Sequence, residues 1–73
     1  MQMPAPGIYQ HFRNRQLYQV LGIAKHSETL EPMVMYRALY GDYHVWVRPE
    51  SMFDEMVTHE GAMVPRFSLI KAL

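Results

Sequence analysis

The chain has 73 residues, which is enough for one domain with one hydrophobic core. It contains no cysteine, so neither a disulfide framework nor a thiolate metal site can form. Seven basic and seven acidic side chains give a formal net charge of zero, whereas dedicated nucleic-acid-binding domains usually carry a basic excess. No apolar run approaches the roughly 20 residues of a membrane-spanning helix, and the N-terminus lacks a signal-peptide pattern. These features predict a single cytoplasmic domain over residues 1–73, with no membrane partner and no cofactor.

The N-terminal third of the chain predicts a lead-in, a hairpin and a loop. Residues 1–6 contain two prolines and are expected to form a flexible lead-in, since proline disfavours the start of a regular element. Residues 7–12 and 17–26 are rich in aromatic and branched side chains. This composition predicts a β-hairpin that turns at residues 13–15. The polar residues 27–32 are predicted to form a loop.

The clearest hairpin signal lies in the middle of the chain. Residues 33–40 are again rich in aromatic and branched side chains. Gly41 and Asp42 follow, a pair typical of tight turns because glycine accepts a positive φ. Residues 43–48 are therefore predicted to return as the partner strand. Pro49 ends that strand, because proline has no N–H to donate to a strand ladder.

A short helical segment is predicted next. Ser51 is followed three residues later by Asp54, a spacing that resembles a capping box. It predicts one helical turn over residues 51–54. Met52 and Phe53 within it are expected to fill the core.

The C-terminal third predicts another hairpin and a final strand. Residues 55–59 and 62–67 are expected to pair through a tight turn at Glu60 and Gly61, and a proline in the second arm marks an edge strand. Residues 68–73 are apolar enough either to pair with the N-terminal strand or to lie in an interface. Altogether the sequence predicts an all-β fold of five to six short antiparallel strands, arranged as a small barrel or sandwich.

The expected tight turn at Gly41 and Asp42 also fixes a register. A two-residue turn places Arg37 opposite Trp46, and directly opposite partners share a face of the sheet. The predicted core face carries Val34, Tyr36, Ala38, Val45 and Val47. The predicted outer face carries Met35, Arg37, Leu39, His44, Trp46 and Arg48.

The chain also resembles a small bacterial domain family of unassigned function. The resemblance lies in motifs spread over nearly the whole chain: Gly7-x-Tyr9-x-His11-Phe12, His26-Ser27-Glu28-Thr29-x-Glu31-Pro32, Tyr36-Arg37-Ala38-Leu39-Tyr40-Gly41, Trp46-Val47-Arg48-Pro49-x-x-Met52-Phe53 and Val64-Pro65-Arg66-Phe67. It implies a fold similar to SH3-type barrels. It implies no activity, substrate or cofactor, so function must be argued from a site.

The first candidate site is an aromatic and arginine-rich surface on the middle hairpin, made of Arg37, Tyr40, Tyr43, Trp46 and Arg48. Exposed rings beside arginine suit peptides, and they suit single-stranded nucleic acid, whose bases stack on rings while arginine contacts phosphate. The alternative is structural: Met35, Leu39 and a neighbouring loop would cover the Trp46 ring.

The second candidate site is the polar loop after residue 25, with His26, Glu28 and Glu31 and with His11 across the sheet. Histidine and carboxylate side chains can hold zinc or transfer protons. The spacing fixes no third ligand, so no metal site is assigned. The alternative is a loop whose polar side chains bond to their own backbone.

These sites leave three hypotheses for function. The leading one is a recognition module, without catalytic residues, that binds a peptide or a single nucleic-acid strand through the aromatic surface. The second is a small enzyme or metal-dependent site at the polar loop. The third is a protein–protein interaction domain with no small ligand, as a monomer or weak homodimer.

Overall fold

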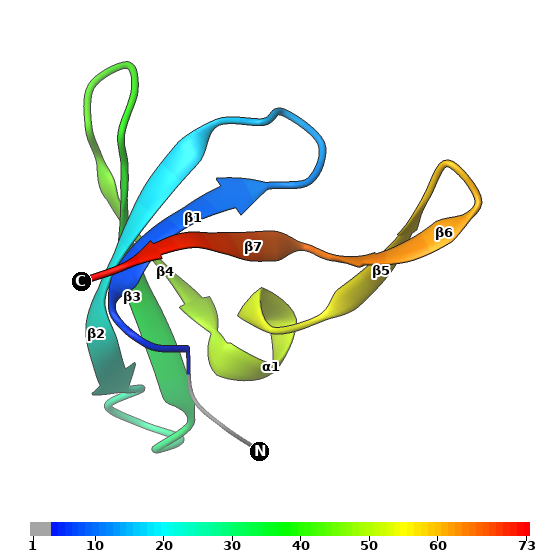
Figure 1. Ribbon diagram of the computed structural model, residues 1–73. Helices are drawn as coiled ribbons and strands as arrows, with labels where there is room; N and C mark the ends of the chain where they lie inside the picture. The colour runs from blue at the N-terminus through cyan, green and yellow to red at the C-terminus, as the bar shows by residue number, and fades with distance from the viewer. Residues whose placement is uncertain (1–3) are drawn as a thin grey trace.

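The computed structural model describes residues 4–73, so the first half of the expected lead-in, residues 1–3, lies outside the described residues. Within residues 4–73 the chain forms seven strands and one short helix (Figure 1). In chain order they are β1 (Gly7–His11), β2 (Leu17–Lys25), β3 (Pro32–Ala38), β4 (Val45–Pro49), α1 (Glu50–Phe53), β5 (Met56–His59), β6 (Ala62–Pro65) and β7 (Phe67–Ala72).

Two antiparallel sheets make up the fold. The larger has the strand order β4-β3-β2-β1-β7, and the smaller is the β5–β6 hairpin. Figure 1 shows this hairpin reaching away from the larger sheet, with α1 beside its base. The all-β class and the helical turn near residue 51 are confirmed. The strands number seven rather than five to six, and they do not close into a barrel.

Two predicted hairpin turns are confirmed by their backbone geometry. Arg15, in the β1–β2 turn, has a φ of 62°, and the Asn14 side chain accepts a hydrogen bond from the N–H of Gln16. Glu60 and Gly61, between β5 and β6, both have positive φ, at 52° and 79°. Two positive φ angles in a row are typical of the tight turn whose twist matches that of paired strands.

The C-terminal strand resolves an alternative left open by the sequence. β7 pairs antiparallel with β1, with Gly7 opposite Ala72 and His11 opposite Phe67. The backbones approach closely at Gly7, where a Cβ atom would lie 2.7 Å from the carbonyl oxygen of Lys71. A side chain at this position would therefore disrupt the pairing of β1 with β7, the first and last strands.

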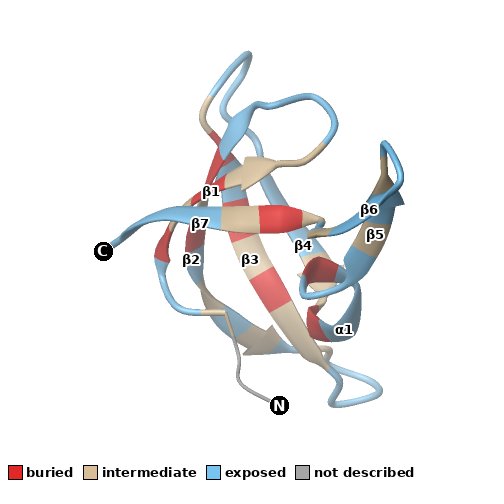
Figure 2. Ribbon diagram, turned by 45° about the vertical axis from the view of Figure 1, so that its right-hand side comes forward, coloured by how far each residue is buried: buried red, intermediate tan, exposed pale blue. Residues whose placement is uncertain are grey.

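The core lies on one face of the five-stranded sheet, where α1 packs (Figure 2). Tyr36 contacts Phe67 edge to face and Phe53 at a tilt, and Phe53 and Phe67 stack with centroids 4.2 Å apart. Met52, also predicted to fill the core, is 46% exposed, whereas Phe53 is 2% exposed. A single helical turn can direct only one of two successive side chains inward. The buried apolar residues are Tyr9, Tyr18, Val20, Val34, Tyr36, Ala38, Phe53 and Phe67.

The predicted register of the middle hairpin is wrong by one residue. Trp46 lies opposite Tyr36, and Arg37 lies opposite Val45. Residues 39–43 form a longer loop, in which the N–H of Tyr43 bonds to the carbonyl of Tyr40. A shift of one residue moves every side chain of a strand to the other face. Trp46 therefore shares the core face, while the valines of β4 are exposed on the outer face.

Candidate functional site

Trp46 is exposed although it lies on the core side of the sheet. Its partner Tyr36 is 6% exposed, but Trp46 on the outermost strand β4 is 53% exposed. No further strand of the described sheet lies beyond β4 to cover the indole. The sequence left open whether Trp46 is exposed or covered; in the structure the indole is exposed, in a register that differs by one residue from the predicted one.

Arg48 lies on the same face as Trp46 and contacts two rings of the core. It lies two residues along the same strand, so its side chain points to the same face. Its Nε atom donates to the Tyr36 hydroxyl at 3.5 Å, and its guanidinium carbon lies 6.0 Å from the centroid of the Phe67 ring. These contacts hold the guanidinium over the edge of the aromatic core.

The β3–β4 loop, which leads into the strand of Trp46, carries two tyrosines. The hydroxyl of Tyr40 lies 2.7 Å from that of Tyr18, which also accepts a hydrogen bond from the Asn14 side chain. This hydrogen bond with Tyr18, together with burial, raises the pKa of Tyr40. Tyr43 is exposed in the same loop at a φ of 57°. The ring of His44 lies 6.2 Å from that of Trp46.

Arg37 is the one member of the predicted surface that the structure separates from the rest. It pairs with Val45 and therefore points to the face opposite Trp46. We keep the name aromatic–arginine surface for the other four predicted residues: Trp46 and Arg48 on one face of β4, and Tyr40 and Tyr43 in the loop before that strand.

The second predicted site is not brought together. The ring of His26 accepts hydrogen bonds from the N–H groups of Glu28 and Thr29, which makes it a turn-stabilising residue. The N–H of His11 bonds to the carbonyl oxygen of Gln16, just before β2, whereas His26 lies just after β2. At about 3.3 Å per residue along the strand, the two positions are roughly 30 Å apart. Figure 1 shows the loop after β2 at the opposite end of the sheet from the β1–β2 turn.

The two carboxylates of this loop do not gather around His26 or His11 to form a site. Glu28 and Glu31 are exposed, and the backbone of Glu31 is held by hydrogen bonds with Thr29 and His26. Among residues 4–73 no three histidine, aspartate or glutamate side chains gather closely enough to hold a metal ion. The geometry resembles the alternative of a self-bonded polar loop.

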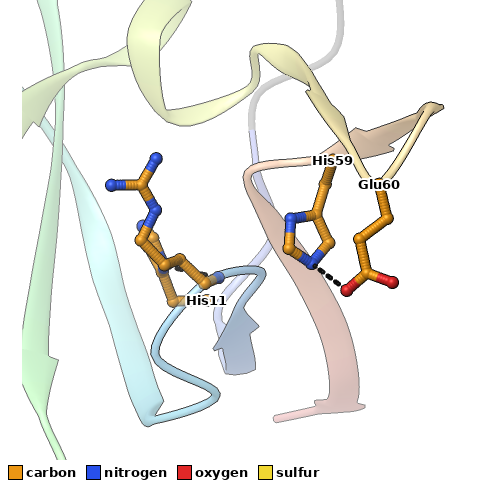
Figure 3. A network of polar contacts seen from close by, with 4 residues as sticks. His11, His59 and Glu60 are labelled. Carbon is orange, nitrogen blue, oxygen red and sulfur yellow. Dashed lines mark hydrogen bonds and ion pairs between the residues drawn. The ribbon is translucent and has the colours of Figure 1, made fainter.

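His11 instead belongs to a cleft that the sequence did not indicate. The cleft lies between the β1–β2 turn and the β5–β6 hairpin, beside the start of β7, and its volume is about 200 Å³. We call it the histidine cleft because His11 and His59 face it from its two sides (Figure 3). Its lining residues are Gln10, His11, Phe12, Arg15, His59, Val64, Pro65 and Ser68.

Burial and arginine charges set the protonation of His11. Partial burial lowers its pKa below the usual 6.5, and the charges of Arg66, Arg48 and Arg13 lower it further. The Nδ1 atom of His11 accepts the N–H of Arg13 at 3.1 Å, so the proton of the neutral ring sits on Nε2. That nitrogen is therefore a hydrogen-bond donor.

The cleft could not be found from the sequence because its parts are distant in the chain. His59 is joined to His11 only through Phe12, whose ring lies 4.9 Å from the His11 ring and 5.3 Å from the His59 ring. These contacts require β7 to pair with β1 and carry the preceding hairpin alongside. The sequence left that pairing as one of two alternatives.

Comparison with known proteins shows which family this chain belongs to. The family model described as a protein of unknown function, DUF1653, matches residues 7–69. The chain belongs to the DUF1653 family. A crystal structure of a DUF1653 protein from Bordetella bronchiseptica is similar, with a TM-score of 0.85 and 29% identity over 96% of this chain and 91% of that chain. No curated protein matches the chain.

Membership of the DUF1653 family confirms the resemblance found in the sequence motifs. The family description assigns no activity, and the Bordetella protein is described only by its family. In the part of the chain that the structure describes, no helix has the length and apolar character to cross a membrane. Function must therefore be argued from the two surfaces described above.

Proposed function

We propose that this DUF1653 domain is a recognition module that binds single-stranded nucleic acid through the aromatic–arginine surface. The observation that carries the proposal is the half-exposed indole of Trp46 beside the fixed guanidinium of Arg48. Exposed rings bind bases by stacking, which contributes about 1–3 kcal/mol per base, and arginine binds the phosphates between them. A 73-residue chain with one tryptophan would gain core stability by burying it, so its exposure calls for another role.

The charge of the chain limits what kind of binder it can be. A net charge of zero provides little long-range attraction for a polyanion. Stacking would therefore supply most of the affinity, and Arg48 would supply one phosphate contact. Each phosphate neutralised on a single strand contributes about −0.7 to the slope of log affinity against log salt. A slope close to −1 is expected, which is shallow for a nucleic-acid-binding domain.

A peptide is the second candidate ligand, because β4 is an edge strand. One side of β4 pairs with β3, and no described strand pairs with the other. An extended peptide can add to such an edge through main-chain hydrogen bonds while side chains enter neighbouring pockets. Trp46 and Arg48 alternate with Val47 along this edge and would read alternate peptide side chains.

The enzyme or metal-site hypothesis at the polar loop gains no support from the geometry. His26 uses Nδ1 for the local turn, and His11 lies at the far end of the sheet. A protein–protein interaction domain stays open as a third function. It differs from the first two in requiring no small or extended ligand.

The test is an amide-resolved NMR titration of the labelled protein with a short single-stranded oligonucleotide and, separately, with a peptide pool. Nucleic-acid binding predicts saturable shifts at Tyr40, Tyr43 and Trp46, with quenching of the indole fluorescence. Trp46→Ala should weaken binding roughly 5- to 150-fold, the equivalent of one stacked base. Val47→Ala is the matched control, because it lies on the same strand and faces away.

Two results would redirect the assignment. Shifts along the β4 amides with peptide, and none with oligonucleotide, would establish the peptide alternative instead. The absence of saturable shifts with either ligand would rule out the aromatic–arginine surface as the binding site of such a module.

A further inference from the structure

The histidine cleft has a chemistry of its own that the aromatic–arginine surface does not use. Apart from Gln10, whose amide donates to the carbonyl oxygen of Arg15, three lining residues have side chains with N–H donors: Arg15 from the β1–β2 turn, His11 from the end of β1, and His59 from the end of β5. Phe12, Val64 and Pro65 provide apolar wall between them. Donors from separate elements that converge on one concavity are typical of a binding site for a small polar group.

His11 is fixed in orientation, and the backbone that carries Arg15 is anchored. His11 is held by the Arg13 N–H on Nδ1 and by an edge contact with Phe67 at 5.0 Å, which leaves Nε2–H as its free donor. The Gln10 side chain donates to the carbonyl oxygen of Arg15 and so anchors the backbone that carries the Arg15 guanidinium. A preorganised set of donors loses little entropy when a ligand binds.

Several arginines lie around His11 although the formal net charge of the whole chain is zero. Among the described residues, the charges that shift the pKa of His11 belong to Arg13, Arg48 and Arg66. Arg15 on the cleft wall adds a fourth guanidinium. An anion that enters the cleft would therefore meet arginine charges from the β1–β2 turn, from β4 and from the segment before β7.

Two carboxylates border this region, and both have basic partners. Glu60 lies 3.2 Å from His59, and Glu55 lies 3.4 Å from the guanidinium of Arg66 (Figure 3 shows the first pair). The Glu60 side chain is almost fully exposed and follows His59 directly, so it can turn to solvent when another anion takes its place. Glu60 thus occupies one His59 donor in the absence of ligand.

We propose that the histidine cleft is a binding site for a phosphate monoester. A phosphate monoester carries a charge of about −1.5 to −2 near neutral pH and presents three acceptor oxygens. These match the three donors of Arg15, His11 and His59. A carboxylate would carry about half that charge and presents two acceptor oxygens rather than three. The inference does not depend on the proposed function of the aromatic–arginine surface.

The test uses the full chain and NMR titrations with inorganic phosphate, with a nucleoside 5′-monophosphate and with acetate at matched ionic strength. Phosphate and the monophosphate should give saturable shifts at Arg15, Phe12 and the rings of His11 and His59. Arg15→Gln and His59→Gln should each weaken binding about tenfold or more, since each removes a charge-assisted hydrogen bond. Arg37→Gln is the matched control, because Arg37 is an exposed arginine outside the cleft.

Two results would contradict the proposed phosphate site, and each would contradict a different part of it. Equal responses to acetate and phosphate would overturn the phosphate assignment, and non-saturating shifts that Arg15→Gln leaves unchanged would overturn the site itself. Phosphate binding should persist in Trp46→Ala. This variant therefore separates a failure of the cleft proposal from a failure of the aromatic–arginine surface.

Discussion

Tyr36 and Trp46 lie directly opposite each other on one face of the sheet, yet Tyr36 is buried and Trp46 is exposed. The cause is position within the sheet rather than orientation. β3 is flanked by β2 and β4 and lies under α1 and Phe67, whereas β4 is the outermost strand. Large rings on an edge strand remain available to a ligand even when their side chains point to the core side.

The exposure of Trp46 gives the first prediction. Acrylamide should quench the native indole readily, and Trp46→Ala should lower the free energy of unfolding by about 0.5 kcal/mol or less, as for other surface substitutions. Fluorescence quenching and urea denaturation measure these quantities. A protected indole, together with unfolding of Trp46→Ala, would show that the ring belongs to the core.

The register of the β3–β4 hairpin gives the second prediction. Val47→Lys should leave the fold intact, because Val47 is exposed on the outer face. Val34→Lys should unfold the protein, because it would place an unpaired charge at a fully buried position. Thermal denaturation followed by circular dichroism separates the two. If Val47→Lys also unfolded the chain, the two-residue turn expected from the sequence would be the correct one.

The helical turn gives the third prediction. Phe53→Ala should cost about 3–5 kcal/mol, because the ring stacks on Phe67 in the core. A domain of this size has only roughly 3–5 kcal/mol in total, so the variant should be largely unfolded at room temperature. Met52→Ala, its exposed neighbour, should change stability little. Similar losses for both variants would contradict the inward placement of Phe53 alone.

The pKa of His11 gives the fourth prediction. Burial and the neighbouring arginines lower this pKa in the folded state below its usual 6.5. The unfolded chain therefore binds the proton more tightly than the folded chain does. The contribution of His11 to folding stability is fully present above pH 6.5. It is lost as the pH falls from 6.5 through the lower folded pKa. Urea denaturation at pH 8 and pH 5 measures the loss.

A variant isolates the His11 contribution from those of the other histidines. His11→Asn keeps an acceptor for the Arg13 N–H but cannot be protonated. It should lose less stability between pH 8 and pH 5 than the parent protein does. An identical loss in both proteins would show that His11 does not cause the pH dependence.

The hydrogen bond between Tyr18 and Tyr40 gives the fifth prediction. Tyr40→Phe removes one hydroxyl and should lower stability by about 1 kcal/mol. The raised pKa of Tyr40 adds a pH signature: its contribution is present below pH 10 and is lost as the pH rises through the higher folded value. Stability measured at neutral pH and above pH 10 should therefore differ less in Tyr40→Phe than in the parent. If Tyr40→Phe lost as much stability above pH 10 as the parent does, another group would cause the loss at alkaline pH.

Local signals in the sequence were sufficient for the fold class and most element boundaries. Composition and turn residues predicted the hairpins through residues 13–15 and through Glu60 and Gly61. They also predicted a helical turn at residues 51–54, which the structure has at Glu50–Phe53 with Pro49 rather than Ser51 as its N-cap. These features depend on backbone preferences of a few neighbouring residues, which a sequence states directly. The family motifs pointed to the same family that the model match shows.

The register of β3 and β4 lay beyond such signals. Gly41 permits a tight turn, but the loop extends to residue 43, and within it Tyr40 bonds to Tyr18 on β2. That contact joins residues 22 positions apart, so turn chemistry alone could not predict it. Because strand periodicity is two, this one residue decided that Arg37 leaves the predicted surface while Trp46 faces the core side.

The sequence by itself determined the all-β class and the absence of cysteine chemistry, because these follow from composition and from local conformational preference. Only the tertiary structure decided which side chains share a face, and that His11 lines a cleft with His59 rather than lying near His26. The reason is that β7 returns to pair with β1 and brings the β5–β6 hairpin beside the β1–β2 turn. Contacts of this kind depend on pairing between distant segments, which no local pattern in the chain specifies.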